Sequence, residues 1–94
     1  MMSQKPVDFT RVPSDFLDRE ILRAAIISEL DAINLYEQMA AQASDPDLKA
    51  VLLDITGEEK THAGEFQIML MRLDAEQVKE MDQAKKEIRA ITGK

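Results

Sequence analysis

The chain has 94 residues, a formal net charge of −6 and no cysteine. A chain of this length forms one domain, and the missing thiols exclude disulfides and cysteine-ligated metal sites. The acidic balance argues against nucleic acid as a partner, because phosphate binding requires a basic surface. No apolar run reaches the roughly 18 residues of a membrane span. Residues 1–13 lack the pattern of a secretion signal, so we expect a cytoplasmic protein with no membrane contact.

The N-terminal region, residues 1–13, contains two prolines and little hydrophobic periodicity, which predicts a flexible arm. The remainder, residues 14–94, is predicted to form one helical domain. Its first helix is expected to run to about Ala43, with Ser14 as its N-cap. Acidic side chains in its first turn suit the positive end of a helix, and these are Asp15, Asp18 and Glu20.

A break at Ser44-Asp45-Pro46 separates the first helix from a second one. Asp45 is expected to cap the second helix, and Pro46 to occupy its first position, where no backbone N–H is needed. This helix is predicted to end near Leu73, and the short connection makes the two helices an antiparallel hairpin. A third, shorter helix is expected after Asp74. Its apolar stripe is Val78, Met81, Ala84, Ile88 and Ile91. The predicted fold class is therefore all-α.

Both long helices are expected to present an apolar stripe. The stripe members are Leu22, Ala25, Ile26, Ile33, Tyr36 and Ala40 in the first helix, and Leu48, Leu52, Ile55, Phe66, Met69, Leu70 and Leu73 in the second. One short third helix cannot cover two long apolar faces, and a domain of this size is marginally stable alone. We therefore expect a homo-oligomer in which a second copy covers the remaining apolar surface.

Three titratable side chains interrupt these stripes: Glu29 in the first helix, and Glu59 and His62 in the second. Burying an ionised carboxylate without a partner is strongly unfavourable. Neither stripe carries a lysine or arginine, so the three groups cannot neutralise one another, whereas a metal dication can. We therefore predict that Glu29, Glu59 and His62 are metal ligands. The alternative is a Glu29–His62 ion pair that fixes helix register, which leaves Glu59 unexplained.

The spacing Glu59-x-x-His62 places both side chains on one helix face, about one turn apart. A Glu-x-x-His pair with a lone glutamate on a neighbouring helix is the repeated unit of di-iron carboxylate bundles, which contain it twice. This chain contains the unit once, and His62 is its only histidine. The full site is thus predicted to form by dimerisation, as a four-helix-bundle-like centre.

Two residues close to Glu29 are further candidates. Tyr36 lies two turns away on the same stripe and is interpreted first as a core residue. Its alternative role is that of a hydrogen-bond or electron donor beside the metals. Asp31 points elsewhere on the helix and is interpreted first as an exposed acid, with an outer metal-access site as the alternative.

The segment Glu-Leu-Asp-Ala-Ile-Asn-Leu-Tyr that ends at Tyr36, together with Glu58-Glu59-Lys60-Thr61-His62-Ala63, resembles the encapsulated ferritin-like proteins, relatives of rubrerythrin and ferritin. The resemblance implies a half-ferritin whose dimer builds a ferroxidase centre, with Glu29, Glu59 and His62 as iron ligands and Tyr36 as the family's tyrosine. It also implies a ring of dimers, often a decamer, that oxidises Fe(II) for storage inside an encapsulin nanocompartment. No shell-docking segment is recognised after Ile91.

The favoured interpretation is a ferroxidase with a di-iron site shared between two subunits. Carboxylates combined with imidazole suit Fe, Mn or Zn, and Ca is a further candidate for a structural site. Two alternatives stay open: a non-catalytic, metal-stabilised dimerisation module, and a rubrerythrin-like peroxide reductase. Because the chain has no cysteine, such a reductase would need an outside electron donor. The sequence does not choose between dioxygen and peroxide as the oxidant.

Overall fold

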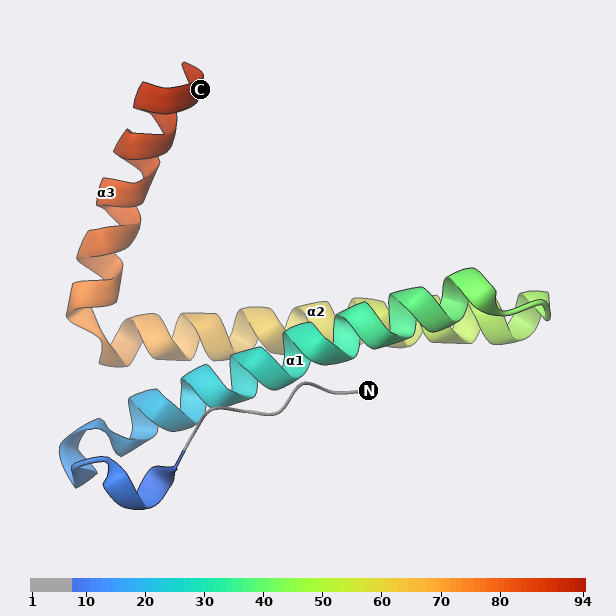
Figure 1. Cartoon of the computed structure of the whole chain (residues 1–94), viewed down its shortest axis with the longest axis horizontal. Coiled ribbons are helices and arrows are strands. Elements are labelled where there is room, and N and C mark those ends of the chain that lie inside the picture. Colours follow the sequence, from blue (N-terminus) through green and yellow to red (C-terminus); the bar gives the residue numbers. More distant parts are fainter. Residues whose placement is uncertain (1–7) are drawn as a thin grey trace.

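A computed structural model describes residues 8–94, apart from the side chain of Asp15. Its elements are the 3-10 helices η1 (Phe9–Arg11) and η2 (Ser14–Phe16) and the α-helices α1 (Leu17–Gln42), α2 (Pro46–Leu73) and α3 (Ala75–Thr92). The regular elements of the described residues are thus all helical, which confirms the predicted class. α1 and α2 lie side by side as an antiparallel hairpin, and α3 leaves the end opposite the turn in a different direction (Figure 1). None of the described helices is long and apolar enough to cross a membrane.

The described part of the N-terminal region contains a local turn, and the flexibility predicted for residues 1–13 stays a prediction. Residues 1–7 of that arm lie outside the described residues, but the described part contains the turn η1. The Asp8 carboxylate accepts a hydrogen bond from the Thr10 amide at 3.1 Å and so caps this turn. The carboxylate also lies 3.4 Å from the Arg11 guanidinium.

The start of the first long helix differs from the prediction. Ser14 was expected as its N-cap, and this is wrong: Ser14 begins η2, and α1 begins at Leu17. The Phe16 amide donates to the Pro13 carbonyl at 2.9 Å. A 3-10 turn therefore satisfies a backbone amide that a side-chain cap would otherwise have to satisfy.

The turn of the hairpin agrees with the prediction. The Asp45 side chain accepts a hydrogen bond from the Leu48 amide at 2.8 Å, and Pro46 is the first residue of α2. At the other side of the turn, the Ala43 amide donates to the Met39 carbonyl at 2.9 Å and closes the end of α1. Residues 43–45 are the whole connection, so the turn holds the two helices side by side.

The seam between α1 and α2 is built mostly from small side chains. The buried residues of the two helices are Ala24, Ala32 and Ala40 on α1 and Leu52, Thr56, Ala63 and Leu70 on α2. Small side chains at a helix contact reduce the distance between the helix axes. The Thr56 hydroxyl donates to the Leu52 carbonyl at 2.9 Å, so its burial leaves no unsatisfied donor.

The predicted apolar stripes are buried only in part. Leu52 and Leu70 lie in the seam, but Leu48, Met69 and Leu73 of the same predicted stripe are exposed. The α2 helix therefore has two apolar faces, one against α1 and one open to solvent. The predicted surplus of apolar surface is present in the single chain.

The third helix, α3, packs on the hairpin only around its start. Asp74 caps it by accepting a hydrogen bond from the Gln77 amide at 3.1 Å, and Gly93 ends it with a φ of +78°. Its predicted apolar stripe is exposed for most of its length, as Ile88 and Ile91 illustrate.

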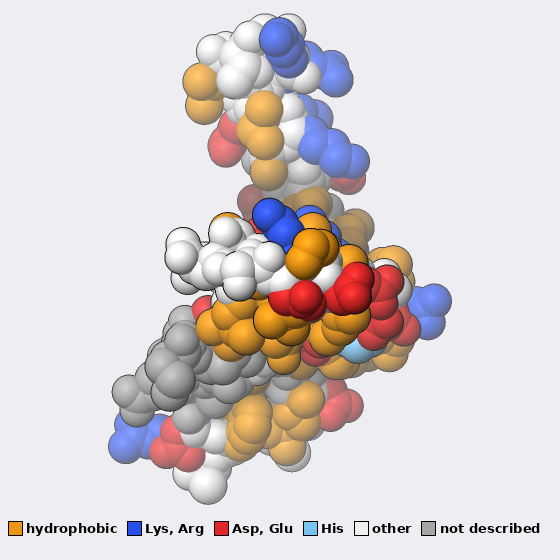
Figure 2. All heavy atoms as spheres, turned by 90° about the vertical axis from the view of Figure 1, so that its right-hand side faces the viewer, with side chains coloured by type: hydrophobic (Ala, Val, Ile, Leu, Met, Phe, Trp, Pro, Cys, Tyr) orange, Lys and Arg blue, Asp and Glu red, His pale blue; other side chains and the backbone are white. Residues whose placement is uncertain are grey.

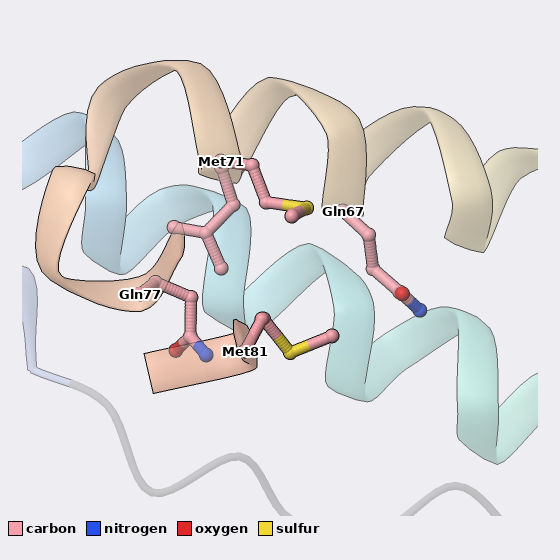
Figure 3. Close-up of a pocket in the computed structure, with 5 residues that line it drawn as sticks. Gln67, Met71, Gln77 and Met81 are labelled. Carbon is pink, nitrogen blue, oxygen red and sulfur yellow. The ribbon is translucent and has the colours of Figure 1, made fainter. Parts of the chain in front are cut away.

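A cavity of about 150 Å³ lies in the corner between α2 and α3 (Figure 3). It is lined by Gln67, Leu70, Met71, Gln77 and Met81. These side chains are apolar or amides, so the cavity offers no metal ligand of the carboxylate or imidazole type and no acid–base group.

The capping contact at the turn gives a direct test of the fold. Replacing Asp45 with alanine removes the acceptor of the Leu48 amide, so we expect the free energy of unfolding to fall by about 1 kcal/mol. Asp47→Ala removes the same charge from the first turn of α2 without removing the cap, and we expect a loss of at most about 0.5 kcal/mol. Urea unfolding at one protein concentration measures both, and equal losses would contradict the capping role.

Candidate metal centre

The structure brings the three predicted ligands together halfway along the hairpin. Glu29 comes from the middle of α1, and Glu59 and His62 come from successive turns in the middle of α2. One ligand-type atom from each residue lies within 4.8 Å of the other two. Within residues 8–94, this is the one cluster of acidic or histidine side chains with such geometry. The convergence of the three is observed, and their role as ligands stays a prediction.

The contacts within this group are too long for hydrogen bonds. His62 Nδ1 lies 3.8 Å from Glu29 Oε2 and 3.7 Å from Glu59 Oε2, beyond the limit of about 3.2 Å. The two glutamates are equally near the imidazole, so the geometry does not single out the alternative Glu29–His62 pair. The three side chains point at a common space without satisfying one another.

One atom of the group is in a costly position. Glu29 Oε2 is buried and has no hydrogen-bond partner among the described residues. Leaving a buried acceptor unpaired costs about 1–3 kcal/mol, and more for a charged group. A cation beside this oxygen would remove that cost, and the oxygen and nitrogen donors of the group match the preferences of Fe, Mn and Zn.

A nearby lysine does not supply the missing positive charge. Lys60 follows Glu59 directly, but its ammonium lies 3.3 Å from the carboxylate of Glu37 on α1. Both side chains are largely exposed, and the pair bridges the two helices beside the group. This pair was not among the residues predicted from the sequence. The sequence places Lys60 directly after Glu59 and Glu37 directly after Tyr36, so each charged residue follows a member of a predicted stripe, and this position could have indicated the pair.

The group is open to solvent on one side. The side chains of Glu29 and Glu59 are 18% and 20% exposed, but that of His62 is 48% exposed. The three side chains were predicted to be buried, and in a single chain their burial is therefore incomplete. Exposed apolar residues occur along the face of α2 that carries His62, at Leu48, Val51, Met69 and Leu73, and the exposed Leu30 directly follows Glu29 on α1. Figure 2, which looks at the turn end of the hairpin, shows hydrophobic and acidic side chains next to one another on that end.

The two further candidates lie outside the converging group. Tyr36 is half-buried on α1, two turns after Glu29. Asp31 is also half-buried, which differs from the exposed acid that was expected, and it is not one of the three converging residues. Neither the role of Tyr36 beside a metal nor that of Asp31 in an outer site is tested by this geometry.

Comparison with known sequences decides the family. A sequence model described as Rubrerythrin matches residues 20–92, which contain all three ligand candidates. The chain belongs to the rubrerythrin family. Among solved structures of related proteins, the encapsulated ferritin domain from Pyrococcus furiosus matches this family member with a TM-score of 0.83 and 44% identity. The match covers 100% of this chain and 98% of that one, so the predicted resemblance is confirmed.

Curated relatives point in the same direction. A ferritin-like–encapsulin shell fusion protein from Pyrococcus furiosus is 54% identical over 74 residues, which are 79% of this chain and 21% of that protein. The encapsulin nanocompartment cargo protein EncC from Myxococcus xanthus is 38% identical over 84 residues, 86% of this chain and 65% of that protein. The chain thus spans less than two thirds of the length of either relative.

A pair of neighbouring glutamates tests the ligand assignment. Glu59 is in the converging group, whereas Glu58 is exposed and outside it. We expect Glu59→Ala to weaken Zn²⁺ binding by at least about tenfold, because removal of even an outer-shell partner has an effect of that size. Glu58→Ala removes the same charge one residue away and should leave binding unchanged. Isothermal titration calorimetry with ZnCl₂ measures both, and equal effects would contradict the assignment.

Proposed function

We propose that this rubrerythrin-family protein is a ferroxidase that binds Fe(II) at Glu29, Glu59 and His62 and oxidises it to Fe(III). The proposal is carried by the convergence of these side chains around a buried carboxylate oxygen that has no hydrogen-bond partner within residues 8–94. Two carboxylates attract the more highly charged Fe(III) more strongly than Fe(II), so the ligand set favours the oxidised product. Each Fe(II) gives one electron to the oxidant, which is dioxygen or peroxide.

The site is completed by a second copy of the chain. One chain supplies a single Glu-x-x-His unit, leaves His62 half exposed and carries exposed apolar side chains along the same face of α2. A two-fold axis beside His62 brings four carboxylates and two imidazoles together, which is the ligand set of a di-iron carboxylate bundle. The apolar residues around the group then form the interface that excludes water from it.

The partner outside the homo-oligomer is an encapsulin shell. Support comes from the relatives, which are named as a shell fusion protein and as nanocompartment cargo. The corresponding location is the inside of a nanocompartment in the cytoplasm, where the shell stores the iron that the ferroxidase delivers. We assign the shell contact to no particular surface of the chain.

A non-catalytic dimerisation module is the second candidate. The exposed apolar side chains around the group favour it as much as they favour a ferroxidase, because both need a second copy. Such a module would associate when a metal binds and would turn nothing over. Oxidant consumption therefore separates the two candidates.

Iron oxidation itself tests the proposed activity. When Fe(II) is added to metal-free protein in air, we expect ferric absorbance to rise, and oxygen to be consumed, faster than in buffer alone. His62→Ala removes one candidate ligand and should lower the rate to that of buffer, while Glu58→Ala should keep it. Metal-dependent association without any consumption of oxygen or peroxide would favour the module. Consumption of peroxide only with an added reductant would favour a peroxide reductase.

Two neighbouring residues test the proposed interface. Met69 lies two turns from His62 on the same face of α2, whereas Ile68 is rotated by about 100° from Met69 around the helix axis. Both residues are exposed. We expect Met69→Glu to raise the dissociation constant of the dimer by at least about tenfold, because it buries a charge in an apolar contact. Ile68→Glu should have a much smaller effect. Sedimentation equilibrium measures both, and a larger effect of Ile68→Glu would place the interface on another face.

A further inference from the structure

The small-residue seam of the hairpin leaves a question about helix register. Large side chains that interdigitate resist sliding of one helix along another, whereas alanines provide few such obstacles. On the α1 side of the seam the fully buried residues are all alanines, Ala24, Ala32 and Ala40, and the large buried side chains, Leu52 and Leu70, come from α2 alone. The three ligand candidates come from both helices, so their convergence requires a fixed register. Directional contacts between the helices add to the resistance that this packing offers to sliding.

At the open end of the hairpin, away from the turn, Asp74 supplies such a contact, and its shorter ion pair is with Arg23. The Arg23 guanidinium donates to the Asp74 carboxylate at 2.9 Å and joins α1 to the end of α2 across 51 residues of sequence. Arg23 precedes Glu29 by six residues, which is about 9 Å along the helix axis. The three-residue turn closes the opposite end. The ligand group therefore lies between two fixed points.

Asp74 is held more firmly than a surface carboxylate. Its side chain is 5% exposed, and the carboxylate also accepts the Gln77 amide at 3.1 Å. Arg19 lies 4.0 Å from the other carboxylate oxygen, and its guanidinium stacks on the Phe16 ring at 3.9 Å. The Gln77 hydrogen bond and the two arginines lower the pKa of Asp74, and they outweigh the opposing effect of burial. The carboxylate is therefore ionised at neutral pH and attracts both arginines.

The second cross-helix ion pair is a weaker candidate for this role. Lys60 and Glu37 are 60% and 48% exposed, and exposed pairs contribute on the order of 0–1 kcal/mol. Arg23 is also 46% exposed, but the carboxylate of Asp74 with which it pairs is only 5% exposed, so water competes less for that carboxylate. If α1 slipped against α2 by one residue, Glu29 would move by about 1.5 Å along the helix axis and rotate by about 100° around it.

We propose that Arg23 and Asp74 are positioning residues, which set the register of α1 against α2 and so hold Glu29 opposite Glu59 and His62. The proposal rests on the proposed function in one respect, namely that this group binds a metal. Neither residue touches the ligand group itself. Their effect on metal binding is therefore transmitted through the relative position of the two helices.

Helix register can be measured without metal, because the chain contains no cysteine. Cysteines at the exposed positions Asp18 and Asp54 carry spin labels near the open end of α1 and in the turn half of α2. The labelled protein is diluted into unlabelled protein, so that only distances within one chain contribute. We expect one narrow distance distribution, which Arg23→Met should broaden or shift. Arg72→Met is the matched control, because Arg72 is exposed on α2 and outside the pair.

Metal affinity provides the second measurement, with Zn²⁺ as the probe. We expect Arg23→Met to weaken Zn²⁺ binding by about tenfold, the lower end of the effect of outer-shell partners on metal sites. Arg23→Lys keeps a positive charge opposite Asp74 and should restore most of the affinity. Asp74→Asn keeps an acceptor for the Gln77 amide, so α3 stays capped while the charge is lost. This variant should weaken Zn²⁺ binding about as much as Arg23→Met does. It therefore still tests the contact if Arg23→Met folds poorly.

The outcomes separate this proposal from the proposed function. Label distances and Zn²⁺ affinities of Arg23→Met and Asp74→Asn that equal those of Arg72→Met would overturn the positioning role. If the unchanged protein binds no Zn²⁺, the metal site is wrong, and the label distances still decide whether the pair sets the register. Restored affinity in Arg23→Lys alongside weak binding in Arg23→Met would support the positioning role.

Discussion

The structure depends on one electrostatic constraint: two carboxylates and one imidazole converge from two helices without a positive side chain among them. Lys60, the nearest basic residue in the sequence, pairs with Glu37 instead, and Glu29 Oε2 is buried with no hydrogen-bond partner in the part of the chain that the structure describes. Folding alone brings negative charge together here, which is unfavourable in a partly desolvated position. A bound cation would reverse the sign of that contribution. The convergence of the three side chains, rather than any one of them taken singly, is what makes the group a candidate binding site.

The packing of the hairpin follows from the same requirement. Carboxylate and imidazole side chains are short relative to the spacing of two helices, so ligands on both helices can share an ion only if the helix axes are close. Alanines at the seam permit this approach, and large apolar side chains such as Leu48, Met69 and Leu73 lie on a second face, although Leu52 and Leu70 stay in the seam. That second face also carries His62, half exposed. The seam that makes the ligands converge thus also leaves the apolar surface that a second copy would cover.

Much of this could be predicted from the sequence, and the failures have physical causes. Asp45 and Pro46 were predictable because their capping chemistry is local, whereas Ser14 failed because a 3-10 turn competed with capping. Hydrophobic periodicity located both long helices but merged two faces of α2 that lie within about a quarter-turn of each other. It therefore placed Leu52 and Met69 on one stripe, although one is buried and the other exposed. The Arg23–Asp74 contact was not predictable, because nothing in a periodic pattern links residues 51 positions apart.

Metal binding and association are linked if the second copy supplies half of the ligands. A metal that binds the dimer more tightly than the single chain must stabilise the dimer, and the dimer must in turn bind the metal more tightly by the same factor. The exposed apolar face would then be covered only weakly in the metal-free protein and firmly in the loaded one. The half-exposed His62 would then take part in both equilibria, as a ligand of the metal and as part of the contact between the two copies. A complete site within one chain would not couple the two equilibria in this way.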